Sequence, residues 1–348
     1  MKTPRLHVLL GAGGVGKTTL AAGYAIALAK SGRRVGLLGI DPSRRLQSAL
    51  GLELPELEVL VPGVGELHAA LLRPEDSMRR WAADACPDPD LRARLLANKF
   101  FLALADRLAA ATDLLAAARI AEWAERDPTL TDLVIDTAPG LNAIEFLRKP
   151  QSLAAFLEGG LVKWLRWLAR SGTKNGLFKG AARKVIGGLD RLGGTPMLLE
   201  LAEFLSLVEE LLAHMLDRVT KAQAWISSPS TEILLVAAVR DDAAHTAGEL
   251  AKALGELKLS ARATVVNRAL PQELGPELEH LDDASLAPDA LPFVRYARGY
   301  SRMQQRVISE ITPLARTVAV IPAWRGLDED TRLDALSALG ERLLDQLN

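Results

Sequence analysis

Residues 8–19 read VLLGAGGVGKTT, and this run limits the possible folds more than any other part of the chain. From Gly11 to Thr18 it matches the pattern G-x-x-x-x-G-K-[ST]. An apolar run precedes the pattern, and a helical pattern rich in Ala and Leu follows it over residues 17–31. A strand, a glycine loop and a helix in this order are the context in which the pattern binds phosphate. The alternative is a glycine-rich turn with a purely structural role.

Each residue type in this loop has a chemical task in holding a nucleotide. Glycines allow successive backbone N–H groups to point into one concavity, and the helix N-terminus adds its partial positive charge. We expect Lys17 to contact the β- and γ-phosphates and the Thr18 hydroxyl to ligate Mg²⁺. The expected ligands are therefore ATP and Mg²⁺. The candidate phosphate-binding residues are Gly11, Gly13, Gly14, Val15, Gly16, Lys17, Thr18 and Thr19.

Six apolar runs predict the strands of a buried, mostly parallel sheet. They alternate with helical patterns, which is typical of a doubly wound α/β fold of the P-loop NTPase type. In such a sheet, ligands bind beyond the carboxyl ends of the strands. The expected strands are Leu6–Leu10, Arg34–Ile40, Leu133–Ile135, Glu232–Ala238, Ala263–Val266 and Thr317–Ile321.

The residues that follow these strands are candidate site residues. Asp136 follows an apolar strand and fits the acid that holds a Mg²⁺-bound water, with a helix cap as the alternative. Asp41 stands in an Asp-Pro pair, where it could orient or deprotonate the attacking water or simply form a turn. We therefore predict Asp41 and Lys17 as catalytic residues. The predicted metal ligands are Thr18 and Asp136.

Two long stretches, about 66–125 and 151–225, are nearly all helical in pattern and contain no convincing strand. Each lies between two expected strands. We predict that they form a helical subdomain inserted into a single P-loop domain that spans residues 1–348. Residues 271–292 contain Pro and Gly among charged residues and predict an irregular surface connection.

Residues 159–184 contain seven basic side chains and no acidic ones, with tryptophans and leucines between them. A basic amphipathic segment of this kind can dock on an anionic membrane surface or receive an apolar client helix. The alternative is that its apolar face packs on residues 196–215 while the basic side chains stay in solvent.

Composition narrows the class of protein. The formal net charge of −1 offers no overall field for nucleic acid. Cys86 is the only cysteine, so no intrachain disulfide can form, and no Cys/His cluster offers a zinc site. Residues 1–10 run straight into the glycine loop, which leaves no room for a signal peptide. Charges interrupt every apolar stretch well before the ~18 residues of a membrane span, so we expect a cytoplasmic protein.

Four stretches resemble the arsenical-pump and tail-anchored-protein-targeting ATPases, a family with a deviant Walker A loop. They are GAGGVGKTTLAA, GIDPSRRLQSALGL, VIDTAPGLNAIEFL and VVNRALP. The C-terminal stretch QQRVISEITPLARTVAVIPAWRGLDE is similar to the last strand and loop of the family. The motifs DPSRRLQSALGL and NAIEFL are most similar to the bacterial, anion-transporting ATPase-like branch.

The resemblance implies an ATP-hydrolysing dimer, a homodimer or a heterodimer with a related ATPase, whose nucleotide-driven switch handles a client protein or helix. Asp41 would be the switch I acid that acts on water, and residues 136–140, which end at Gly140, would sense the γ-phosphate. Asn267 would hydrogen-bond adenine, and the loop that begins at Pro322 and includes Trp324 would cover the base.

Ala12 departs from the family pattern. The family normally has a second lysine there, which reaches across the dimer and stabilises charge on the partner's nucleotide. Hydrolysis is then slow, or Arg44 or Arg45 replaces the lysine, or a partner subunit supplies one. The alternative function is a weakly active nucleotide-binding subunit of a hetero-oligomer. A small-molecule kinase or synthetase shares the loop, but the sequence offers no recognisable acceptor pocket.

Cysteine content separates the chain further from parts of the family. The paired zinc-binding cysteines of the targeting ATPases are missing after Asn267, so we do not expect a zinc-stapled dimer. Arsenite activation needs several converging thiolates, and Cys86 alone cannot provide them. Arsenite pumping is therefore not expected.

Overall fold

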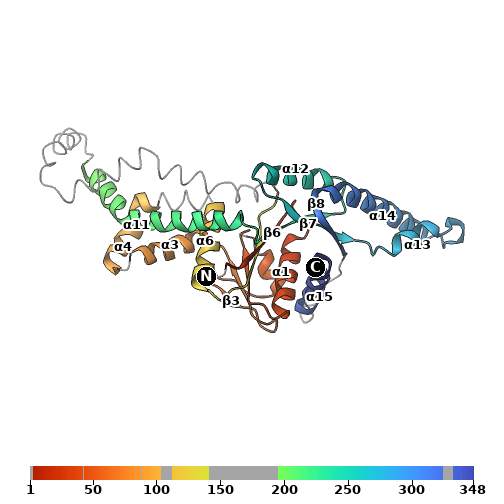
Figure 1. The fold of residues 1–348 in the computed structure, drawn as a ribbon, viewed down its shortest axis with the longest axis horizontal. Helices are drawn as coiled ribbons and strands as arrows, with labels where there is room; N and C mark the ends of the chain where they lie inside the picture. Colours follow the sequence, from red (N-terminus) through yellow and green to blue (C-terminus); the bar gives the residue numbers. More distant parts are fainter. Residues whose placement is uncertain (1–2, 42, 87, 103–111, 141–194, 324–331) are drawn as a thin grey trace. The chain divides into compact units, whose positions relative to one another are not determined.

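The computed structural model in Figure 1 describes residues 3–41, 43–86, 88–102, 112–140, 195–323 and 332–348. The chain divides into two compact units. The first comprises Met1–Leu72, Ala124–Leu147 and Trp225–Asn348, and the second comprises Arg73–Trp123 and Arg148–Ala224. The inserted subdomain within a single domain of 1–348 stays a prediction.

The first unit contains a sheet of eight strands in the order β3-β4-β2-β5-β1-β6-β7-β8. Every neighbouring pair runs parallel except β3 and β4, which are antiparallel. This arrangement confirms the predicted doubly wound, mostly parallel α/β sheet. The strands are β1 (Arg5–Gly11), β2 (Val35–Gly39), β3 (Val59–Leu60), β4 (Leu67–Leu71), β5 (Asp132–Asp136), β6 (Thr231–Ala238), β7 (Ala261–Ala269) and β8 (Ala315–Pro322).

Helix α1 (Lys17–Lys30) begins directly after the glycine loop and is part of the core. Its residues from Leu20 to Ala29 are all buried, as expected for a helix that is apolar on every side. It packs on α15 (Arg332–Leu347). A Cβ on Gly340 would overlap the carbonyl oxygen of Gly23, so only glycine permits this close approach of the two helices. The packing fixes the helix whose N-terminus faces the site.

The prediction that residues 66–125 contain no strand is wrong at their start, because Leu67–Leu71 forms β4 and pairs with β2. The run LHAAL contains two alanines and a histidine, which have weak strand preference. Its pairing with β2, and with β3 on the other side, makes it a strand. The antiparallel β3 was not predicted because a strand of two residues leaves no recognisable pattern in the sequence.

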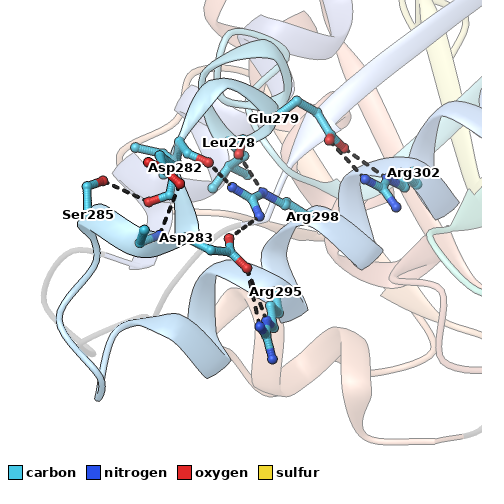
Figure 2. A network of polar contacts seen from close by, with 10 residues as sticks. Leu278, Glu279, Asp282, Asp283, Ser285, Arg295, Arg298 and Arg302 are labelled. Atoms are coloured by element: carbon cyan, nitrogen blue, oxygen red, sulfur yellow. Dashed lines mark hydrogen bonds and ion pairs between the residues drawn. The ribbon is translucent and has the colours of Figure 1, made fainter.

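The prediction of an irregular connection over 271–292 is also wrong in part. The segment contains α13 (Leu274–His280) and η2 (Asp283–Ser285), and α14 (Leu291–Ile311) begins within it. Figure 2 shows how the charged residues of this segment bind α14. Glu279 accepts hydrogen bonds from Arg302 at 2.9 Å, and Asp283 pairs with Arg295 at 3.3 Å. These contacts across the chain order a segment whose local sequence gives weak helix signals.

The described part of the second unit is helical, with a buried polar cluster. The Arg80 guanidinium lies 2.6 Å from Glu122, and the Trp81 indole N–H donates to the same carboxylate at 3.0 Å. The guanidinium of Arg218 lies 5.9 Å from the centre of the Trp81 ring. The helical pattern predicted over 151–225 is confirmed for its described residues, which lie in one long helix. The helices are α3 (Pro74–Ala85), α4 (Pro89–Ala97), α6 (Thr112–Arg126) and α11 (Thr195–Ile226), the last two extending into the first unit.

No helix among the described residues combines the length and the apolar character needed to cross a membrane. The basic amphipathic segment 159–184 lies outside the described residues, as does Trp324. The predictions made for both remain untested.

Candidate functional site

The glycine loop joins β1 to α1, as the sequence predicts. Gly13 and Gly14 are exposed at its outer side, whereas Val15 is buried in the core. Gly16 has a φ of 94°, in the left-handed region, and a Cβ there would overlap the side-chain amide of Asn267. Asn267 Nδ2 donates a hydrogen bond to the Val15 carbonyl at 2.8 Å. The loop conformation therefore depends on glycine and is held from the end of β7.

Lys17 points back along the loop rather than into solvent. Its amine donates hydrogen bonds to the carbonyls of Gly11 at 2.9 Å and Ala12 at 3.0 Å. Burial lowers the pKa of Lys17, and the nearby carboxylates of Asp136 and Asp41 oppose that shift. The amine thus interacts with both predicted acids, Asp136 and Asp41.

Asp136 and Thr18 meet beside Lys17. Burial raises the pKa of the Asp136 carboxyl to about 7, and its hydrogen bond with the Thr18 hydroxyl and the charge of Lys17 oppose the shift. The second oxygen, Oδ1, is buried and has no hydrogen-bond partner among the described residues. A buried carboxylate oxygen without a partner beside a hydroxyl is a suitable donor set for a hard cation such as Mg²⁺. The residues present therefore fit the metal.

Asp41 follows β2 and is half-buried. Its Oδ1 accepts a hydrogen bond from the Ser43 backbone N–H at 2.9 Å. This hydrogen bond forms the turn that was the alternative role predicted for Asp41. Asp41 also lines the same cleft as Lys17 and Thr18. The turn holds the carboxylate at the cleft, so the two roles are compatible.

These groups surround one open cleft of about 530 Å³. It brings the glycine loop together with Asp41 and with both arginines proposed to replace the missing lysine. Among the described residues, its lining contains Lys17 and three arginines but one acidic residue, Asp41, so it suits a polyanion. The lining residues are Gly14, Gly16, Lys17, Thr18, Thr19, Asp41, Arg44, Arg45, Ser48, Ala49, Thr137 and Arg268.

Gly140, Asn267 and Pro322 do not line the cleft. The backbone N–H of Gly140 donates to the Gly11 carbonyl at 2.9 Å, which joins the segment after β5 to the loop. Asn267 is buried and contacts the loop through Val15. Pro322 ends β8, and the next residue, Ala323, hydrogen-bonds the Ala269 carbonyl at 2.6 Å. The base-binding roles of Asn267 and Pro322 stay predictions.

Three residues near the loop were not singled out in the sequence, although Thr137 belongs to the segment 136–140. Thr137 donates its hydroxyl to the Leu9 carbonyl at 2.6 Å and lines the cleft. Arg240 lies 3.4 Å from the Gly13 carbonyl, and Arg268 lines the cleft beside Gly16. Both arginines follow the apolar residues of β6 and β7. Ligands bind beyond the carboxyl ends of parallel strands, and this rule, which identified Asp41 and Asp136, could have identified the arginines too.

Comparison with known proteins agrees with this geometry. A family model described as anion-transporting ATPase matches residues 5–282. The chain belongs to that family. The family resemblance drawn from the motifs is thereby confirmed, and the predicted P-loop NTPase fold is consistent with it.

Individual members of the anion-transporting ATPase family match at moderate identity. The protein named ATPase ARSA2 of Chlamydomonas reinhardtii is 26% identical over 275 residues, 76% of this chain and 68% of that protein. ATPase get3 of Aspergillus terreus is 31% identical over 195 residues, which cover 55% of this chain and 56% of the fungal protein. The arsenical pump-driving ATPase of Acidiphilium multivorum is 29% identical over 157 residues, but these are only 26% of that protein. This chain thus spans little more than half of the fungal relative that it matches.

Proposed function

We propose that this protein binds Mg·ATP in the cleft described above and hydrolyses it to ADP and phosphate. One observation carries the proposal. Lys17, Thr18 and Asp41 line a single cleft, and Asp136 contacts Thr18 beside it. These are the charge, the hydroxyl and the acids that phosphoryl transfer to water requires.

Lys17 would neutralise charge on the β- and γ-phosphates. Its amine would exchange its bonds to the Gly11 and Ala12 carbonyls for bonds to phosphate oxygens. Thr18 and Asp136 would hold Mg²⁺, the one directly and the other through water. When bound, Mg²⁺ neutralises charge that develops on the transferred phosphoryl group.

Asp41 would orient or deprotonate the attacking water. The Ser43 backbone fixes its carboxylate at the rim of the cleft, so little conformational freedom is lost when water binds. A positioned base contributes about 10²–10⁴-fold to such a step, so the role is worth testing by mutation.

We further propose that two nucleotide-binding chains act together as a dimer, either identical or related. Ala12 cannot supply a charge to a partner's nucleotide, and its side chain packs on the core. Arg44 and Arg45 both line the cleft, and Arg240 lies beside Gly13, so three arginines are placed to substitute. Low activity of the chain alone is expected if none of them does.

The coupled task would be the handling of a client protein or helix, with the segment 159–184 as a candidate contact for a client or a membrane surface. The alternative, a weakly active nucleotide-binding subunit of a hetero-oligomer, is favoured by Ala12. Arsenite pumping is not proposed, because Cys86 is the only cysteine of the sequence. A cytoplasmic location and the absence of a nucleic-acid partner stay predictions.

Phosphate release from ATP, measured across a range of protein concentrations, tests this function. An active dimer gives a specific activity that rises with concentration and then levels off, and Asp41→Asn removes most of it. A preparation that releases phosphate equally well with Asp41→Asn contradicts the assignment of this site to hydrolysis.

A further inference from the structure

Arg268 has an unusual backbone conformation at the end of β7. Its φ is 61°, in the left-handed region that glycine favours. The pairing of β7 with β8 shifts register between Asn267 and Ala269, so Arg268 is the extra residue of a bulge.

The other non-glycine residue with positive φ in the described part of the chain is Lys258. It follows α12 (Ala243–Glu256), whose C-terminus closes with a bond from Leu259 N to the Leu254 carbonyl at 2.9 Å. Positive φ is common at such a helix end. Arg268 has no helix end to account for its conformation.

Side chains of α14 hold this bulge. The Tyr300 hydroxyl donates to the Arg268 carbonyl at 2.5 Å. The Gln304 side chain accepts from the Leu270 N–H at 2.7 Å and donates to the Leu270 carbonyl at 3.1 Å. Contacts of Arg298 and Arg302 with the preceding segment brace the same stretch of α14 (Figure 2). An unfavourable backbone that is held from several sides often marks a functional position.

The bulge turns the side chain of Arg268 to the cleft. Arg268 lines it together with Gly16, Lys17 and Thr19. Its side chain makes no ion pair with any described residue, in contrast to Arg240, which is paired with Asp242. The guanidinium is therefore available to a ligand.

The order of strands places Arg268 away from the residues expected at the γ-phosphate. Asp41 follows β2, which lies two strands from β1 on one side, and Arg268 lies at the end of β7, two strands from β1 on the other. The glycine loop lies between them. A nucleotide whose γ-phosphate faces Asp41 would direct its α-phosphate and nucleoside toward Arg268.

We infer that Arg268 is a nucleotide-binding residue that contacts the part common to ATP and ADP, and that Tyr300 is its positioning residue. The inference rests on the proposed function and adds a residue to that site. A guanidinium can bind an oxygen of the α-phosphate or stack on the base, and ATP and ADP have both of these groups.

Calorimetric titration of the full chain with Mg·ATP and with Mg·ADP tests the inference. Arg268→Gly removes the guanidinium, while glycine adopts a φ of 61° without strain, so the melting temperature should not fall. We expect the dissociation constants of both nucleotides to rise by the same factor, at least about tenfold, as for a lost charged hydrogen bond. Arg306→Ala, an exposed arginine of α14, is the charge-matched control and should change both constants less than about twofold.

Tyr300→Phe should weaken both nucleotides by a smaller factor, and should have no further effect once Arg268 is glycine. A Tyr300 effect that persists in the Arg268→Gly background overturns the positioning role. Unchanged affinity in Arg268→Gly, or a loss confined to ATP, overturns the assignment of Arg268. Failure of the wild-type protein to bind either nucleotide rejects the proposed function and this inference together, whereas normal wild-type binding with an unaffected Arg268→Gly variant rejects this inference alone.

Discussion

Replacement of His7 should destabilise the sheet in a way that depends on pH. His7 is buried in β1 between two carboxylates from neighbouring strands. Its Nε2 lies 2.9 Å from Asp132 Oδ1, and its Nδ1 lies 3.1 Å from Glu232 Oε2. Burial lowers the pKa of His7, but the two carboxylates outweigh burial and the pKa is raised. The two carboxylates thus favour the charged imidazolium, which links three strands.

The loss of stability in His7→Gln depends on the partners that remain for the carboxylates of Asp132 and Glu232. Loss of one member of a buried charge cluster costs about 3–5 kcal/mol when the remaining charge has no other partner. Arg33 lies 3.1 Å from Asp132, and Arg262 pairs with Glu232, so the remaining carboxylates keep a cation each. We therefore expect a loss below that range, about 2 kcal/mol at pH 6, as for a hydrogen bond to a charged group.

The sign of the pH dependence follows from the raised pKa. The stabilisation is complete below the unfolded value of about 6.5 and decreases as pH rises through the folded value, by up to about 1.4 kcal/mol per pH unit. Above that pH a neutral His7 keeps its hydrogen bond to Asp132, worth about 1 kcal/mol. The difference between wild type and His7→Gln should therefore be largest near pH 6 and smallest at the alkaline end.

Urea unfolding of both proteins from pH 6 to pH 10, followed by circular dichroism, measures this difference. His280→Gln, which changes an exposed histidine at the end of α13, is the control and should follow the wild-type curve. A His7→Gln difference that stays constant over this pH range would show that the imidazole is neutral in the fold. A difference below about 1 kcal/mol at pH 6 would show that the cluster does not stabilise the sheet.

Two further predictions concern catalysis. Asp41→Asn should keep Mg·ATP affinity within a few-fold and reduce turnover by about 10²-fold or more, because the amide cannot accept the proton of water. Steady-state kinetics with saturating ATP measure the turnover. Ala12→Lys should raise turnover in a dimer, since a cation supplied across an interface is worth about 10³–10⁵ in the rate of phosphoryl transfer. Little change in turnover would contradict this. If alanine replacement of Arg44, Arg45 or Arg240 then lowers turnover, that arginine supplies the charge in place of the lysine.

The predicted residues that lie at or beside the cleft share a local signal in the sequence. The glycine loop, with Lys17 and Thr18, is recognisable because fixed spacing within eight residues specifies the turn and the helix start. Asp41 and Asp136 were found because the carboxyl ends of parallel strands lie at one edge of a sheet. Their convergence with Lys17 in space follows from the fold rather than from any one motif.

Features that depend on distant partners could not be predicted. His7 reads as an ordinary residue of an apolar strand, since its partners Asp132 and Glu232 are over one hundred residues away in the sequence. β4 becomes a strand through its pairing with β2, and the bulge at Arg268 depends on Tyr300 of α14. In each case the local sequence permits several conformations, and tertiary contacts select one of them.

The central claim is that the loop of residues 11–18 binds Mg·ATP, and calorimetric titration tests it most directly. The account predicts saturable binding to the wild-type protein, and a loss of about 10- to 100-fold in affinity for Lys17→Ala, because the charged hydrogen bonds to the phosphates disappear. Lys30→Ala, at the exposed far end of the same helix, should bind as wild type does. Equal affinity of wild type and Lys17→Ala for Mg·ATP would contradict the account.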